Sequence, residues 1–277
     1  MIKIGMSTSS VYPFSAESAF RLAKEAGFDG MEIMITVDPV TQDATALRAL
    51  STRYDLPILS VHAPVLVFSQ FVWGMEAVRK LAKSVELAAA VGAKTVVVHP
   101  PFRLERGYAR VFESTVRQIA AQYGVELAVE NMFPLRFGGL TVRAQSPSSD
   151  PVFIDCDAIT LDFSHAALAG RDSLEFAMAM GDRLRHVHLT DGTVAMGEGK
   201  LLDDEHLVPG HGTQPVAEVL QYLATRKWNG SLIAEVNTRL CDSDDERLAM
   251  LRETRDFAVA QLKAGNRARM HRSARVS

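Results

Sequence analysis

Six short apolar runs in this chain each end in a side chain that can bind a metal ion. Each run has the length and composition of a buried β-strand. Their last residues, in chain order, are His62, His99, Glu130, Asp162, His188 and Glu235. Most of these residues lie roughly 25 to 45 positions apart, about the length of one strand-helix-strand unit. Because parallel strands that repeat in this way end at one face of a sheet, we predict that the six side chains converge.

Four of these side chains form a donor set suited to a divalent cation. Glu130, Asp162 and Glu235 supply three carboxylates. His188 supplies an imidazole. Oxygen-rich sets of this kind favour Mn²⁺ or Mg²⁺ and also accept Zn²⁺ or Co²⁺. Three crowded carboxylates would repel one another unless a cation neutralised them. We therefore predict at least one divalent metal ion here, with a larger number left open.

Five further polar residues could extend this site. They are His62 and His99 from two strand ends, and His165, Asp204 and His206 from later segments. Either group could bind another metal ion, since zinc accepts mixed imidazole and carboxylate ligands. Either could equally bind substrate hydroxyl groups or orient the ligands of the first ion. The residues themselves leave these alternatives open.

Two ionisable residues inside the strands receive a different interpretation. Glu32 is charged among apolar neighbours, and a hydrogen bond that supports the ligands is favoured over direct ligation. His186 precedes His188 by two residues. We expect it to alternate away from the site, toward the helix layer, and assign it no function.

The pattern of the whole chain predicts a scaffold that would bring these strand ends together. Eight β-like runs alternate with helical segments, and the runs end at Met6, Ile35, His62, His99, Glu130, Asp162, His188 and Glu235. Residues 133–153 hold Pro, Gly, Ser and Asp without a helical period, so helix 5 should be shortened or replaced by a loop. With no Gly-x-Gly-x-x-Gly fingerprint, this alternation predicts an α/β fold, a (β/α)8 TIM barrel.

The barrel is expected to form a single domain over residues 1–264, with its last helix running from Glu246 to about Ala264. Residues 265–277 contain four arginines without an acidic partner and are expected to form a basic, solvated C-terminal tail.

Composition excludes several classes of function. The chain has 277 residues, a formal net charge of -3 and 47% hydrophobic residues. This charge offers no general attraction for nucleic acid or an anionic membrane. Two cysteines make no disulfide framework and fit a reducing compartment. The N-terminus resembles no signal peptide and no apolar run could cross a bilayer, so a cytoplasmic location is expected.

The strand-end segments resemble those of the xylose isomerase-like TIM barrels. That family includes sugar and sugar-phosphate isomerases and epimerases, and the endonuclease IV repair enzymes. The matching segments are Ser60-Val61-His62-Ala63-Pro64, Val97-Val98-His99-Pro100, Ala128-Val129-Glu130-Asn131, Leu161-Asp162-Phe163-Ser164-His165, His186-Val187-His188-Leu189-Thr190-Asp191-Gly192 and Ala234-Glu235-Val236. The resemblance covers nearly the whole barrel. In its isomerase branch it implies one divalent metal held by Glu130, Asp162, His188 and Glu235, with both glutamates also acting as the acid/base pair.

The endonuclease IV branch implies more metal ions. There, His62 and His99 would share Glu130 with one zinc, and His165, Asp204 and His206 would hold another. The segment Asp204-Glu205-His206 matches the Asp-x-His of the repair enzymes. However, residues 36–44 contain no Lys or Arg, whereas a protein that reads DNA needs basic groups along the phosphate track.

The favoured function is therefore a metal-dependent isomerase or epimerase of a sugar, sugar phosphate or related hydroxy-carbonyl compound. One glutamate would remove a carbon-bound proton and the other would return it, through a metal-stabilised enediolate. The expected partner is this small-molecule sugar, with nucleic acid disfavoured, no membrane partner and a homo-oligomer left open. One alternative is a multi-zinc phosphodiesterase, like endonuclease IV, acting on abasic DNA. Another is a barrel that binds a metabolite without turnover.

Six cationic residues in or near the strand-end loops could bind a phosphate or carboxylate of the substrate. They are Arg103, Arg106, Arg136, Arg143, Lys200 and Arg239. The sequence does not rank them.

Overall fold

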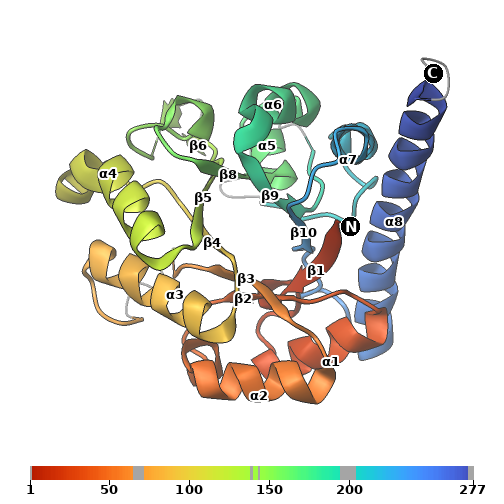
Figure 1. The fold of residues 1–277 in the computed structure, drawn as a ribbon, viewed down its shortest axis with the longest axis horizontal. Helices are drawn as coiled ribbons and strands as arrows, with labels where there is room; N and C mark the ends of the chain where they lie inside the picture. Colours follow the sequence, from red (N-terminus) through yellow and green to blue (C-terminus); the bar gives the residue numbers. More distant parts are fainter. Residues whose placement is uncertain (1, 65–71, 138–139, 143, 194–203, 274–277) are drawn as a thin grey trace.

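Eight parallel strands close into a barrel in the computed structural model, and helices surround it (Figure 1). The structure describes residues 2–64, 72–137, 140–142, 144–193 and 204–273. In this part of the chain, no helix is both long and apolar enough to span a membrane.

The barrel strands follow the chain order and pair in parallel. They are β1 (Lys3–Ser7), β2 (Met31–Met34), β3 (Ile58–His62), β4 (Thr95–Val98), β5 (Glu126–Glu130), β8 (Ala158–Asp162), β9 (Leu184–Leu189) and β10 (Ser231–Ala234). Each strand pairs with the next, and β1 closes the barrel by pairing with β10. Strands such as Thr95-Val96-Val97-Val98 are buried on both faces, which is why they appear as continuous apolar runs rather than alternating ones. The predicted TIM barrel is confirmed.

The helices form the outer layer of the barrel (Figure 1). They are α1 (Ala16–Ala26), α2 (Ala44–Tyr54), α3 (Ala77–Val91), α4 (Arg106–Tyr123), α5 (Phe163–Leu168), α6 (Ser173–Met180), α7 (Val216–Thr225) and α8 (Asp244–Ser273). Local signals set their ends. The Ser15 side chain accepts a hydrogen bond from the Ser18 amide and caps α1, whereas Gly27 ends this helix with a φ of 84°.

No α-helix lies between β5 and β8 in the described residues, as the sequence predicted. Two short antiparallel strands, β6 (Leu135–Phe137) and β7 (Leu140–Val142), pair in this segment. A 3-10 helix at Pro151–Phe153 follows them. In the described residues between β5 and β8, the regular structure is therefore limited to these two short strands and the 3-10 helix.

The last helix is longer than predicted. It extends to Ser273, so the predicted helix end near Ala264 was wrong, whereas side chains such as Arg267 and Met270 are exposed, as expected of a solvated segment. Gly265 is buried against α7, where a Cβ atom would lie 2.5 Å from the backbone oxygen of Gln221. The glycine therefore permits close packing of α8 on α7 instead of ending the helix.

Candidate active site

The four predicted metal ligands meet where β5, β8, β9 and β10 end. Glu130 and Asp162 are the last residues of their strands, His188 lies near the end of β9, and Glu235 directly follows β10. His188 Nδ1 lies 2.9 Å from Glu130 Oε1 and 2.9 Å from Glu235 Oε2. It lies 3.6 Å from Asp162 Oδ2. Carboxylates from three strands thus surround one ring nitrogen.

The donor atoms fit a divalent cation. Ligand atoms of Asp162, His188 and Glu235 all lie within 4.8 Å of one another. Asp162 Oδ2 is buried and has no hydrogen-bond partner among the described residues. A buried carboxylate oxygen without a partner is costly, and a cation bound beside it would remove that cost. Oxygen and imidazole donors together suit Mn²⁺, Mg²⁺, Zn²⁺ or Co²⁺.

The charges of the site depend on one another. Burial opposes ionisation of Glu130, but His188 and His99 hold the pKa of its carboxyl well below the usual value. Burial likewise opposes the charged form of His188, and the Glu235 and Glu130 carboxylates nevertheless raise its pKa well above the usual value. Each group is stabilised in its charged form by opposite charge nearby. The carboxylates therefore require positive charge at this point, whether from a proton or from a metal ion.

The first additional group, His62 and His99, contacts the carboxylate of Glu130. His99 Nε2 is 2.8 Å from Glu130 Oε2, and His62 Nε2 is 3.2 Å from the same oxygen. His62 is fully buried and its ring stacks on that of His188, with centroids 5.5 Å apart. The structure thus brings this pair into direct contact with a predicted ligand.

The second additional group, His165, Asp204 and His206, lies beside Asp162. Asp204 Oδ2 is 3.1 Å from His165 Nε2 and 2.9 Å from His206 Nε2. His206 adopts a left-handed backbone with a φ of 45°, which is uncommon for a residue other than glycine. The Asn237 amide donates a hydrogen bond to the His206 carbonyl oxygen and helps to hold it there. All nine predicted site residues therefore belong to one contiguous cluster.

Glu32 lies deeper in the barrel and contacts this cluster. Its Oε1 is 3.2 Å from His188 Nε2, the ring nitrogen opposite the predicted metal side. Its Oε2 accepts a hydrogen bond from Ser60 Oγ at 2.8 Å and lies 2.9 Å from His186 Nε2. Glu32 thus contacts the predicted ligand His188, but Glu32 Oε1 and His188 Nε2 form no hydrogen bond, so the predicted supporting hydrogen bond to this ligand is not formed.

The expectation that His186 faces the helices was wrong. Residues two apart in a strand share a face, so His186 points the same way as His188. Its partner Glu32 lies on β2, which is not adjacent to β9 in the barrel. The two side chains therefore meet across the barrel interior.

Three polar residues that the sequence reasoning missed orient the predicted ones. Ser9 Oγ donates a hydrogen bond to Glu235 Oε1 at 2.7 Å. Asn131 accepts from the Asp162 amide at 2.7 Å and donates to its carbonyl oxygen at 3.0 Å. Ser164 Oγ donates to Asp204 Oδ1 at 2.6 Å. Each follows a strand end by one or two residues, and that position is a signal the sequence did contain.

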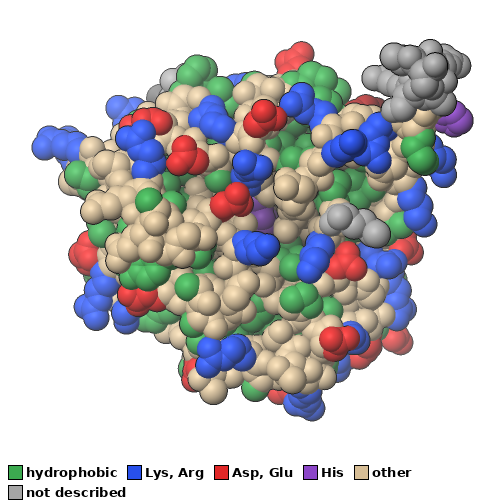
Figure 2. Space-filling model, viewed as in Figure 1, with side chains coloured by type: hydrophobic (Ala, Val, Ile, Leu, Met, Phe, Trp, Pro, Cys, Tyr) green, Lys and Arg blue, Asp and Glu red, His purple; other side chains and the backbone are tan. Residues whose placement is uncertain are grey.

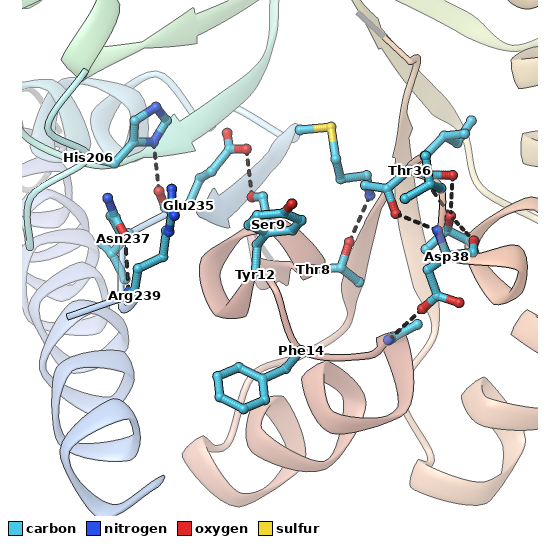
Figure 3. Close-up of a pocket in the computed structure, with 16 residues that line it drawn as sticks. Thr8, Ser9, Tyr12, Phe14, Thr36, Asp38, His206, Glu235, Asn237 and Arg239 are labelled. Atoms are coloured by element: carbon cyan, nitrogen blue, oxygen red, sulfur yellow. Dashed lines mark hydrogen bonds between the residues drawn. The ribbon is translucent and has the colours of Figure 1, made fainter. Parts of the chain in front are cut away.

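A pocket of about 430 Å³ opens beside the cluster. Its lining comes from the ends of β1, β2 and β10 and includes Glu235 and His206 (Figure 3). The space-filling view, taken along the direction of Figure 1, shows a histidine side chain at the centre of this face, with acidic and basic side chains near it (Figure 2). The cluster is thus connected to a cavity that a small molecule could occupy.

The structure describes the side chains of three of the six candidate cations. Arg239 lines the pocket. Arg103 and Arg106 are exposed on the loop after β4 and at the start of α4, outside that lining. The side chains of the other three, Arg136, Arg143 and Lys200, lie outside the described residues.

The fold is a TIM barrel, and the polar cluster lies at the C-terminal ends of its strands. TIM-barrel enzymes have their active sites at this face. The chain belongs to the xylose isomerase-like TIM barrel family, whose model matches residues 20–259.

Several known proteins are similar to this chain over most of its length and most of their own. An uncharacterized protein of Mycobacterium tuberculosis is 47% identical over 280 residues, which cover 94% of this chain and 98% of that protein. Fructoselysine 3-epimerase of Shigella flexneri is 22% identical over 261 residues, covering 86% of this chain and 91% of the relative. The crystal structure of a D-tagatose 3-epimerase-like protein superposes with a TM-score of 0.68 at 26% identity, covering 94% of this chain and 100% of the other.

Proposed function

We propose that this protein is a divalent-metal-dependent isomerase or epimerase of a sugar, a sugar phosphate or a related hydroxy-carbonyl compound. The observation that carries the proposal is the convergence of Glu130, Asp162 and Glu235 around a single nitrogen of His188. The names of two relatives, a fructoselysine epimerase and a tagatose epimerase-like protein, support the substrate class.

Four residues would hold the cation: Glu130, Asp162, His188 and Glu235. When bound, it would polarise the carbonyl of the substrate and stabilise negative charge developing beside it. Glu32 would fix the His188 ring from its other nitrogen, and Ser9 would fix the Glu235 carboxylate. Such supporting contacts keep ligands in one orientation.

Glu235 and Glu130 would move the proton. Each of them has an oxygen 2.9 Å from His188 Nδ1, so both carboxylates face the same point of the barrel mouth. One carboxylate would take a proton from the carbon next to the carbonyl and the other would return it. Glu235 lines the pocket, whereas Glu130 is 1% exposed and is contacted by four histidines, His62, His99, His165 and His188. Glu235 is therefore the better placed of the two to meet substrate.

Substitution of Glu235 tests this proposal. A panel of ketoses, aldoses, inososes and their phosphates would be incubated with the protein and Mn²⁺ in D₂O, and product and deuterium incorporation measured by NMR. Glu235→Gln keeps an oxygen ligand but removes the base, so we expect it to retain metal and to lose about a hundredfold or more in rate. Glu253→Gln, the same change on the exposed α8 residue, should leave the rate unaltered. Turnover by Glu235→Gln at the wild-type rate would contradict the two-glutamate mechanism.

A second candidate is metal-assisted hydrolysis of a phosphodiester, and a specific feature favours it. His62, His165 and His206 each direct Nδ1 at a backbone carbonyl oxygen, which can only accept a hydrogen bond. In their neutral forms the Nε2 atoms then lack a proton and face carboxylate oxygens. Histidines held in this way are typical of metal ligands, and additional ions would fit there.

Metal stoichiometry separates the two candidates. One ion per chain supports the isomerase, and three support the hydrolase. The segment that would approach DNA, residues 36–44, lines the pocket in part and has no Lys or Arg, which disfavours a phosphate track. We therefore expect no metal-dependent nicking of abasic DNA, assayed at low salt.

A further inference from the structure

The pocket continues beyond the cluster along a mainly apolar wall. Glu235 and His206 lie at one part of its lining, and Tyr12 and Phe14 from the loop after β1 lie at another (Figure 3). Tyr12 is 47% exposed and Phe14 is 46% exposed. Val37, after β2, is 67% exposed. Large apolar side chains gathered around one open cavity are typical of a ligand-binding surface.

Arg239 places a positive charge on this wall. Its guanidinium lies over the Tyr12 ring, 5.8 Å from the centroid. Its backbone amide donates a hydrogen bond to Asn237 Oδ1, which orders the chain at this position. Figure 3 shows the Arg239 side chain between Asn237 and Tyr12.

The carboxylates that line the pocket form no ion pair with Arg239. Asp38 accepts hydrogen bonds from the amides of Val40 and Ala16, at 3.0 and 3.1 Å. Glu235 is bound by Ser9 and lies against His188. Within the described part of the chain, no carboxylate lies within ion-pair distance of Arg239. The guanidinium is therefore free to bind an anionic group of a ligand.

The size of the cavity indicates what kind of ligand it could bind. A volume of about 430 Å³ falls in the range of pockets that enclose drug-sized molecules. The cavity has a polar part at the cluster, an aromatic wall and a cation. A free monosaccharide has hydroxyl groups for the polar part but no group that would contact the aromatic wall and the cation.

We propose that the substrate is a sugar-derived hydroxy-carbonyl compound joined to an apolar or aromatic group that carries an anion. Its sugar part would lie at Glu235, its apolar part against Tyr12 and Phe14, and its carboxylate or phosphate on Arg239. This inference rests on the proposed function and specifies the substrate class of the same site.

A matched pair of probes tests whether Arg239 binds an anionic group of the ligand. The fructose adduct of para-aminobenzoate carries a ketose, a ring and a carboxylate, and the fructose adduct of aniline lacks only the carboxylate. Binding of each would be measured by isothermal titration calorimetry with Mn²⁺ present. We expect the carboxylate adduct to bind about tenfold more tightly, as one charge-assisted hydrogen bond allows. Arg239→Gln should remove this preference, Arg239→Lys should keep part of it, and Arg106→Gln should keep all of it.

The ring contact is tested in the same assay. Tyr12→Ala should weaken binding of the aniline adduct about fivefold, whereas Tyr12→Phe, which keeps the ring, should leave it unchanged. Equal binding of the two adducts, no binding of either, or a charge preference that survives Arg239→Gln would overturn the inference. None of these results needs turnover. The proposed function is judged separately, by the rate and metal content of Glu235→Gln.

Discussion

Two buried polar clusters lie one above the other in this barrel, and they differ in charge balance. The mouth cluster consists of Glu130, Asp162, His188 and Glu235. The inner cluster consists of Glu32, Ser60 and His186, whose side chains are all fully buried. The inner cluster sets one carboxylate among a hydroxyl group and imidazoles. The mouth cluster sets three carboxylates around one imidazole nitrogen.

This difference favours the mouth cluster over the inner cluster as the place where a cation would bind. Ligand atoms of Glu32, His186 and His188 also lie within 4.8 Å of one another, so proximity alone would allow an ion there. However, the inner cluster holds one carboxylate and the mouth cluster holds three, and the mutual repulsion of three buried carboxylates favours a cation at the mouth. His188 belongs to both clusters, with one ring nitrogen in each. We therefore expect the inner cluster to influence the mouth cluster through His188.

The largest effect is expected from removing a mouth ligand. Asp162→Ala or His188→Ala should abolish the bound divalent ion while the barrel stays folded. Metal analysis of protein purified without chelator, with circular dichroism as the check on folding, measures this. Asp256→Ala, on the exposed face of α8, serves as the control and should keep the metal. Full metal occupancy in both site variants would rule out the assignment.

A smaller effect is expected from the inner cluster. Glu32→Gln keeps the size of the side chain but removes the charge beside His188 Nε2, so metal affinity should fall about 10- to 100-fold. A competition titration with a chelating dye measures it. Ser60→Ala removes only one hydrogen bond to Glu32 and should cost about 1 kcal/mol of unfolding free energy. Unchanged metal affinity in Glu32→Gln would show that the two clusters are independent.

The smallest effect on the primary ion is expected from the histidines on Glu130. His62→Ala and His99→Ala should leave one divalent ion in place if the protein binds a single metal, because Glu130 keeps its contact with His188. Metal counts before and after substitution test this. Loss of one ion of several, together with a phosphodiesterase activity, would instead support the hydrolase.

The sequence alone determined the barrel and the identity of the central residues. The hydrophobic periods of strands and helices are local properties of the sequence. The ends of α1 are also set locally, by Ser15 before the helix and Gly27 after it, as the structure confirms. The position of a carboxylate or imidazole at the end of a strand is also local. Because every parallel strand of a closed barrel ends at the same face, local order was sufficient to predict that these residues meet.

Only the tertiary structure decided three other features. Helix α8 continues through Gly265 because α7 packs closely against that position, and no local signal records the contact. Ser9 reaches Glu235 across 226 residues of sequence because β1 closes the barrel onto β10. Arg239 could be distinguished from Arg103 and Arg106 only once the residues that line the pocket were known. Each feature depends on contacts between residues far apart in the chain, and those contacts are set by barrel closure and register rather than by residue type.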